Sequence, residues 1–156
     1  MRLTDILQAD CVKVPLEATS KEQAINELVD LLADHAGIAQ RDSLKKAVWS
    51  REMTRTTGIG HGVGIPHGKL EGVGKLSLAI GRAANPIEYG AIDHKPVDLI
   101  LLLVSPVDQT GPHIQALATI SRMLTDASFR SAIRTAATSA DLFRVITEQE
   151  AKETVS

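Results

Sequence analysis

The stretch that decides the fold is Val97-Asp98-Leu99-Ile100-Leu101-Leu102-Leu103-Val104. It is apolar except for Asp98 and has the length of a strand, so it predicts a strand with both faces covered. Helices are the elements that cover such a strand in a layered domain. The run therefore predicts an α/β fold, a mixed β-sheet of about five strands flanked by helices, with this strand at its centre.

The chain upstream of this run begins with an expected edge strand and a helix. Residues 11–16 alternate apolar and polar side chains, and Pro15 limits their pairing to an edge position. Ser20 with Gln23 three positions later resembles a capping box, and apolar residues then recur at helical spacing until Gly37. The pattern predicts a helix whose apolar face lies in the core.

The segment between residues 56 and 69 is the most unusual part of the sequence. A second helix, capped by Asp42 or Ser43, is expected to end near residues 51–53, just before it. The segment contains five glycines, a proline and two histidines. Glycine-rich loops expose backbone amides that form anion-binding concavities. A histidine fixed beside such amides can accept a phosphoryl group and pass it on.

Short strands and three more helices are expected around the central run. Residues 76–80 and 87–89 alternate like two strands, and the pair Asn85-Pro86 between them is typical of a turn. Downstream helices are expected from Thr110 onward, over residues 129–136 and after a cap at Ser139.

Residue His67 is the expected acceptor in the glycine-rich segment. The ring of Pro66 restricts the backbone before it, and Gly68 leaves room around the imidazole for a docking protein. Neutral imidazole is a nucleophile near neutral pH. The alternative is a loop histidine without a chemical task.

Three further residues are candidates for the same site. His113 is expected in the first turn of a helix, where the dipole favours a neutral ring that donates to an anion. Arg51 offers a guanidinium fork to phosphate oxygens, and Thr57 a hydroxyl to an oxyanion or to His67. Each has a structural alternative: a partly buried histidine, a solvated arginine at a helix end, and a threonine that closes the preceding helix.

Composition narrows the class of protein. With 156 residues the chain suits one domain over residues 1–150, followed by a frayed polar tail over 151–156. A net charge of -2 and an aromatic content of 3% argue against nucleic acid as a partner. The lone Cys11 fits a reducing compartment, and no apolar run has spanning length, so we expect a cytoplasmic protein that is not embedded in a membrane.

Two other classes of site compete with phosphoryl transfer. A phosphate-binding or nucleotide-binding module is disfavoured because Lys69 is followed by Leu70 instead of serine or threonine. A zinc-dependent hydrolase would use His61, His67 and His113 as metal ligands, but the sequence has no fourth ligand at a recognised spacing. We therefore expect neither a metal nor another cofactor.

The motifs resemble those of a known family. Arg51-Glu52, Thr57-Gly58-Ile59-Gly60 and Gly64-Ile65-Pro66-His67-Gly68-Lys69 closely resemble the signature of type-2 EIIA domains of the phosphoenolpyruvate-dependent phosphotransferase system. The segments 3–7, 91–99 and 107–113 extend the likeness over nearly the whole chain and are most similar to the nitrogen-regulatory branch. That branch often has asparagine where this chain has His61, which raises the question of a third imidazole near the site.

The resemblance implies a phosphoryl carrier more than an enzyme that turns over a small molecule. It implies that His67 accepts phosphate from an HPr-like phosphocarrier, that His113 stabilises the phosphorylated ring, and that Arg51 lies beside it. In the nitrogen branch the phosphorylation state regulates other proteins, among them potassium transporters and sensor kinases. In the transport branch, which is the alternative, the phosphate passes to the EIIB domain of a fructose or mannitol permease.

Overall fold

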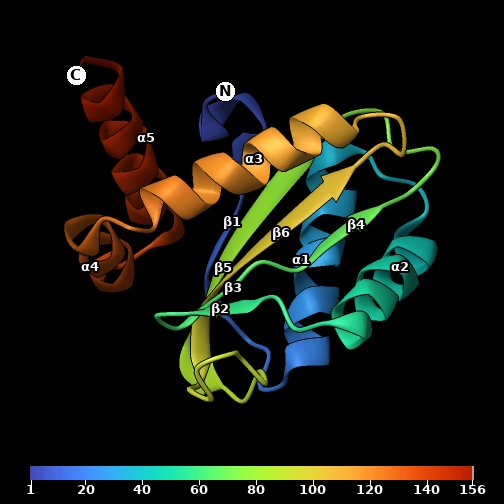
Figure 1. The fold of residues 1–156 in the computed structure, drawn as a ribbon, viewed down its shortest axis with the longest axis horizontal. Helices are drawn as coiled ribbons and strands as arrows, with labels where there is room; N and C mark the ends of the chain where they lie inside the picture. Colours follow the sequence, from blue (N-terminus) through green and yellow to red (C-terminus); the bar gives the residue numbers. More distant parts are fainter. Residues whose placement is uncertain (156) are drawn as a thin grey trace.

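The centre of the molecule is a mixed six-stranded sheet (Figure 1). The computed structural model describes residues 1–155. The strands are β1 (Leu7–Leu16), β2 (Gly58–Gly60), β3 (Val63–Gly64), β4 (His67–Lys69), β5 (Ser77–Ile87) and β6 (Val97–Ser105). Their order is β1-β5-β6-β3-β2, and β4 also pairs with β6. The expected mixed α/β sheet is confirmed, with β6 central and β1 at an edge.

Helices cover both faces of this sheet. They are η1 (Leu3–Asp5, a 3₁₀ turn), α1 (Lys21–Ala36), α2 (Arg41–Thr54), α3 (Thr110–Met123), α4 (Ala127–Thr135) and α5 (Ser139–Val155). Figure 1 shows α1 behind the long strands and α3 across their front. Every residue of β6 except Asp98 is therefore buried, as the apolar run predicts.

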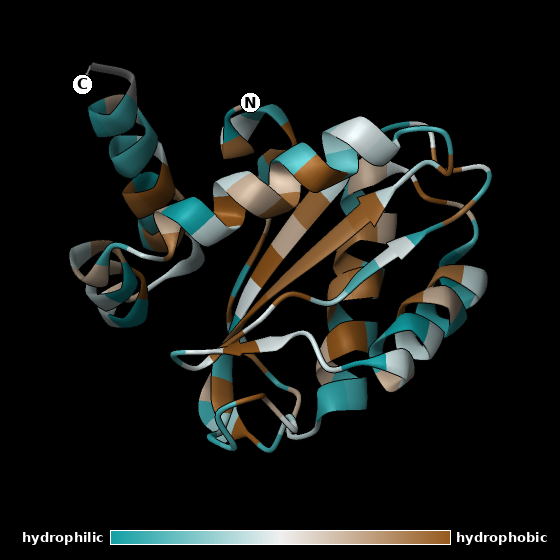
Figure 2. Ribbon diagram, in the orientation of Figure 1, coloured by the Kyte–Doolittle hydropathy of each residue, from teal (hydrophilic) through white to brown (hydrophobic). Residues whose placement is uncertain are grey.

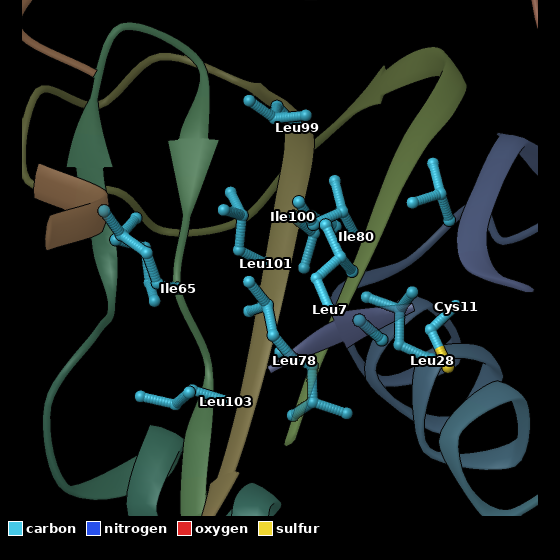
Figure 3. Packing of buried hydrophobic residues seen from close by; sticks show 14 of the residues in the cluster. Leu7, Cys11, Leu28, Ile65, Leu78, Ile80, Leu99, Ile100, Leu101 and Leu103 are labelled. Atoms are coloured by element: carbon cyan, nitrogen blue, oxygen red, sulfur yellow. The ribbon is translucent and has the colours of Figure 1, made fainter. Parts of the chain in front are cut away.

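The core lies between the sheet and its helices. Figure 2 shows hydrophobic residues concentrated along β5 and β6, while the helices carry hydrophobic and hydrophilic residues in alternation. Figure 3 shows Leu28 of α1 facing Leu78 and Ile80 of β5, and all three side chains are fully buried. Burying one such side chain stabilises the fold by roughly 1.5–3 kcal/mol. This packing makes the sheet a rigid base for the residues at its end.

Local sequence signals predict both ends of α1 but not the residue that caps α2. In α1 the Ser20 hydroxyl accepts a hydrogen bond from the N–H of Gln23 at 3.2 Å, and Gly37 ends the helix with a φ of 71°. Both ends are confirmed. In α2 the cap is Gln40, without a side-chain hydrogen bond, so the prediction of Asp42 or Ser43 as the cap was wrong.

The predicted turn at Asn85-Pro86 is wrong, because β5 runs through it from Ser77 to Ile87. The pairing of β5 with β6 shifts register between Arg82 and Ile87. Pro86, which has no N–H to donate, lies in this irregular stretch.

The last helix, α5, includes residues 151–155, which the sequence predicts to fray. Fraying of this last turn stays a prediction.

Candidate functional site

The end of the sheet places the two central histidines next to each other. Strand β4 runs parallel to β6, with His67 opposite Leu103 and Lys69 opposite Ser105. The chain leaves β6 after Ser105 and begins α3 at Thr110, so His113 lies in the first turn of that helix. Ligands of α/β proteins bind where parallel strands reach their carboxyl ends. The site occupies such an end of β4 and β6.

One hollow of about 450 Å³ joins three of the four predicted site residues. It is lined by Ala47, Arg51, His67, Gly68, Lys69, His113 and Leu117. The ring centroids of His67 and His113 are 5.3 Å apart, and the rings meet edge to face at 65°. Helix α2, strand β4 and helix α3 each contribute, so the hollow exists only in the folded chain.

The hydrogen bond of His67 fixes which of its nitrogens can react. Its Nδ1 lies 2.9 Å from the carbonyl oxygen of Ile65. A carbonyl only accepts, so Nδ1 carries the hydrogen and donates it. The neutral ring then has its lone pair on Nε2. This geometry turns the imidazole into a nucleophile without a separate general base.

Both imidazoles are held in the neutral form. Burial lowers the pKa of His67 below its ordinary value, and the positive charge of Arg51 lowers it further. Burial, with smaller effects of His67, Lys69 and Arg51, lowers the pKa of His113 to about 4. Near neutral pH the hollow therefore contains two uncharged rings.

This depression of the pKa predicts a loss of stability in acid. Below about pH 6.5 the unfolded chain protonates His113, while the folded chain resists this until its pKa of about 4. The free energy of unfolding should therefore fall between about pH 7 and pH 4.5, by about 2 kcal/mol from this residue. Urea unfolding of the wild-type protein and a His113→Asn variant at both pH values measures it. An equal pH dependence in the two proteins would contradict the prediction.

Two cations make the hollow suitable for an anion. Arg51 lies in the last turn of α2, and its Nη1 donates to the carbonyl oxygen of Arg55 at 3.0 Å. The Nζ of Lys69 donates to Thr110 Oγ1 at 3.3 Å. Lys69 lines the hollow but is not among the site residues predicted from the sequence. Side chains two apart on a strand share a face, so its spacing from His67 was the available signal.

The fourth predicted residue, Thr57, lies elsewhere. Its N–H donates to Glu52 Oε2 at 2.8 Å, its hydroxyl donates to Glu52 Oε1, and Tyr89 Oη lies 2.9 Å from that hydroxyl. Lys21 Nζ pairs with the same carboxylate at 2.7 Å. Thr57 is buried and does not line the hollow. Its hydroxyl proton is used in this cluster, which holds the start of the glycine-rich segment beneath the end of α2.

A close approach of α2 and β4 depends on Gly68. A Cβ at this position would lie 2.9 Å from Cγ2 of the fully buried Val48 and 3.4 Å from the Val48 nitrogen. We expect Gly68→Ala to push β4 away from α2 and to destabilise the fold by about 1–3 kcal/mol. Chemical denaturation measures this, with Gly74→Ala as the matched control because its Cβ would meet nothing within 4 Å. Equal stabilities of the two variants would contradict the prediction.

The question of a third imidazole is answered by the position of His61. It does not line the hollow around His67. It lies with Ile59, Asp98 and Arg134 along another depression, and its carbonyl accepts a hydrogen bond from Arg134. Among residues 1–155 there is no group of three His, Cys, Asp or Glu side chains that could hold a metal ion. In the same residues, no helix is both long and apolar enough to cross a membrane.

Two neutral rings and two cations lie together at the end of an α/β sheet, an arrangement suited to binding an anion beside a histidine. Residues 5–149 match the family described as phosphoenolpyruvate-dependent sugar phosphotransferase system, EIIA 2. The chain belongs to this family of phosphoryl carriers, and the resemblance seen in its motifs is confirmed.

Individual relatives fall into two branches of the system. The chain is 32% identical to the nitrogen regulatory protein of Klebsiella oxytoca over 95% of this chain and 91% of that protein. It is 34% identical to the fructose-specific EIIA component of Haloferax volcanii, over 78% and 79% of the two chains.

Solved structures agree with the fold. The nitrogen regulatory protein IIA-Ntr from Neisseria meningitidis superposes with a TM-score of 0.84 at 28% identity, over 91% of this chain and 97% of that one. The mannitol IIA protein of Escherichia coli superposes with a TM-score of 0.75 at 19% identity, over 89% and 97%. The second match shows the shared architecture alone.

Proposed function

We propose that this protein accepts a phosphoryl group on Nε2 of His67 from an HPr-like phosphocarrier and regulates other proteins through its phosphorylation state. The observation that carries the proposal is the hydrogen bond from His67 Nδ1 to the Ile65 carbonyl, which leaves Nε2 as the free nucleophile in a cationic hollow.

The transfer step is an in-line displacement. The lone pair of His67 Nε2 attacks phosphorus, the Nε2–P bond forms, and the donor's N–P bond breaks with its electron pair left on the donor nitrogen. No proton has to move, and the Ile65 carbonyl stabilises the positive charge that develops on the ring. Arg51 and Lys69 neutralise the phosphoryl oxygens, so positioning and electrostatics supply most of the catalysis. His113 donates to the same oxygens.

A regulatory role is supported by the similarity to nitrogen regulatory proteins over nearly the full length of both chains. Phosphorylation adds about 1.5–2 negative charges at neutral pH, which is enough to switch binding at the surface around the hollow. Suitable targets are proteins of nitrogen and potassium regulation, such as potassium transporters and sensor kinases. The second candidate, supported by the fructose-specific relative, is transfer to an EIIB domain of a sugar permease.

The proposal is tested by incubating the protein with phosphoenolpyruvate, the first enzyme of the cascade and its carrier. We expect an acid-labile, alkali-stable phosphoprotein, with the added mass on His67 by mass spectrometry. A protein without label, or with label on another residue, would refute the site. Adding purified fructose-type and mannitol-type EIIB domains then separates the two roles, because only a transport component should lose its label to one of them rapidly.

A further inference from the structure

We propose that Ser105 is a positioning residue that fixes the tautomer of His113, so that His113 presents an N–H from Nε2 to the phosphoryl group on His67. The part that concerns the phosphoryl group rests on the proposed function. The part that concerns the tautomer is a property of the unphosphorylated protein and stands or falls separately.

The position of Ser105 connects the end of the sheet to the helix that carries His113. Ser105 is the last residue of β6 and is fully buried, and His113 is 5% exposed. The Ser105 hydroxyl is within hydrogen-bond distance of His113 Nδ1. The carbonyl of Ser105 accepts from the N–H of Leu70, just after β4. The backbone of Ser105 is therefore fixed at the end of the sheet, which places its hydroxyl beside His113 Nδ1.

The direction of the hydrogen bond follows from what the hydroxyl can reach. Within residues 1–155, His113 Nδ1 is the one hydrogen-bond partner of Ser105 Oγ. If Nδ1 carried a hydrogen, the buried hydroxyl would have no acceptor for its own proton, which is unfavourable. With the hydroxyl as donor, Nδ1 accepts, and both Ser105 Oγ and His113 Nδ1 have a partner.

A neutral imidazole has one hydrogen, so Nδ1 as acceptor places it on Nε2. The low pKa of His113 agrees with this, since a protonated ring would carry hydrogens on both nitrogens. The two histidines thus have opposite roles. His67 has its hydrogen on Nδ1 and reacts through Nε2, while His113 has its hydrogen on Nε2 and donates into the shared hollow.

The consequence for the reaction is a donor that stabilises without a full charge. An uncharged N–H of His113 can bond to the phosphoryl oxygens as they pass between donor and acceptor. A ring with its hydrogen on Nδ1 would instead turn a lone pair toward those oxygens and repel them. The serine therefore decides the sign of the interaction between His113 and the phosphoryl group.

Nitrogen-15 NMR of imidazole-labelled protein near neutral pH tests the tautomer directly. We expect the His113 signals to show Nε2 protonated and Nδ1 as an acceptor in the wild-type protein. In Ser105→Ala we expect these shifts to move toward a mixture of tautomers. The matched control is Ser77→Ala, which removes a buried serine hydroxyl on β5 that donates to the Lys75 carbonyl. It should leave the His113 signals unchanged.

The role in transfer is tested on the same variants. Ser105→Ala should slow phosphorylation of His67 by about fivefold, the usual effect of one neutral hydrogen bond, while Ser77→Ala keeps the wild-type rate. If NMR finds the hydrogen of wild-type His113 on Nδ1, or finds this ring charged near neutral pH, the proposed tautomer is refuted. This result does not require any variant to fold. The expected tautomer with equal rates in both variants would overturn the role in transfer. Failure of the wild-type protein to take up phosphate at all would instead refute the proposed function.

Discussion

A His67→Ala variant is expected to take up no phosphate from an active phosphocarrier, while the wild-type protein is labelled completely. The substitution removes the only group in the hollow that combines a free lone pair with a fixed position. His113 cannot replace it, because its Nδ1 lone pair is engaged by the buried Ser105 hydroxyl. In phosphoryl transfer the protein supplies alignment and electrostatic stabilisation, and neither helps without a nucleophile.

The matched control is His61→Ala, which removes an exposed imidazole that does not line the hollow. It should be labelled at the wild-type rate. Both variants should fold, because the ring of His67 is only partly buried and that of His61 is exposed. Circular dichroism checks this. If His67→Ala were labelled, or if His61→Ala were not, the phosphoryl acceptor would have to be a histidine other than His67.

Local signals explain which parts of the fold could be predicted from the sequence. The helix α1 depends on Ser20, Gln23 and Gly37, all of which act within a few residues of its ends. The central position of β6 follows from its apolar run. The continuous β5 could not be predicted, because its end beyond Pro86 depends on the pairing of Ile87 with Val97 of β6, which lies outside the few residues that form the local turn signal. Pairing between strands overrides a local turn signal.

The same distinction applies to the site. His67, Arg51 and His113 stand out because their residue types and neighbours indicate phosphate chemistry, and the fold brings them to one hollow. Lys69 and Ser105 are ordinary residues in the sequence. They enter the proposed mechanism because β4 pairs with β6 in one register, which places them opposite each other beside the histidines. Thr57 shows the opposite outcome. Its place in the glycine-rich segment predicts a site residue, but its hydroxyl bonds within the buried cluster around Glu52.

A Glu52→Ala variant is expected to lose about 3–5 kcal/mol of the free energy of unfolding. The carboxylate of Glu52 is completely buried and pairs with Lys21 Nζ, itself 14% exposed, at 2.7 Å. It also accepts hydrogen bonds from Thr57 and, at 3.3 Å, from the hydroxyl of Tyr89. Removing it takes away the acceptor of a buried ammonium group and of three donors, the N–H and hydroxyl of Thr57 and the hydroxyl of Tyr89. This is far more costly than losing an exposed ion pair.

Urea unfolding measures this loss, with Asp141→Ala as the control. Asp141 forms an ion pair with Arg144 at 2.8 Å on the surface of α5, and its removal should cost less than about 1 kcal/mol. The conservative Glu52→Gln keeps an acceptor for Thr57 but not the charge for Lys21, so it should fall between Glu52→Ala and the wild-type protein. If Glu52→Ala were as stable as Asp141→Ala, the cluster would not hold the glycine-rich segment. In that case the position of His67 would depend on the pairing of β4 with β6 and the contact of Gly68 with α2 alone.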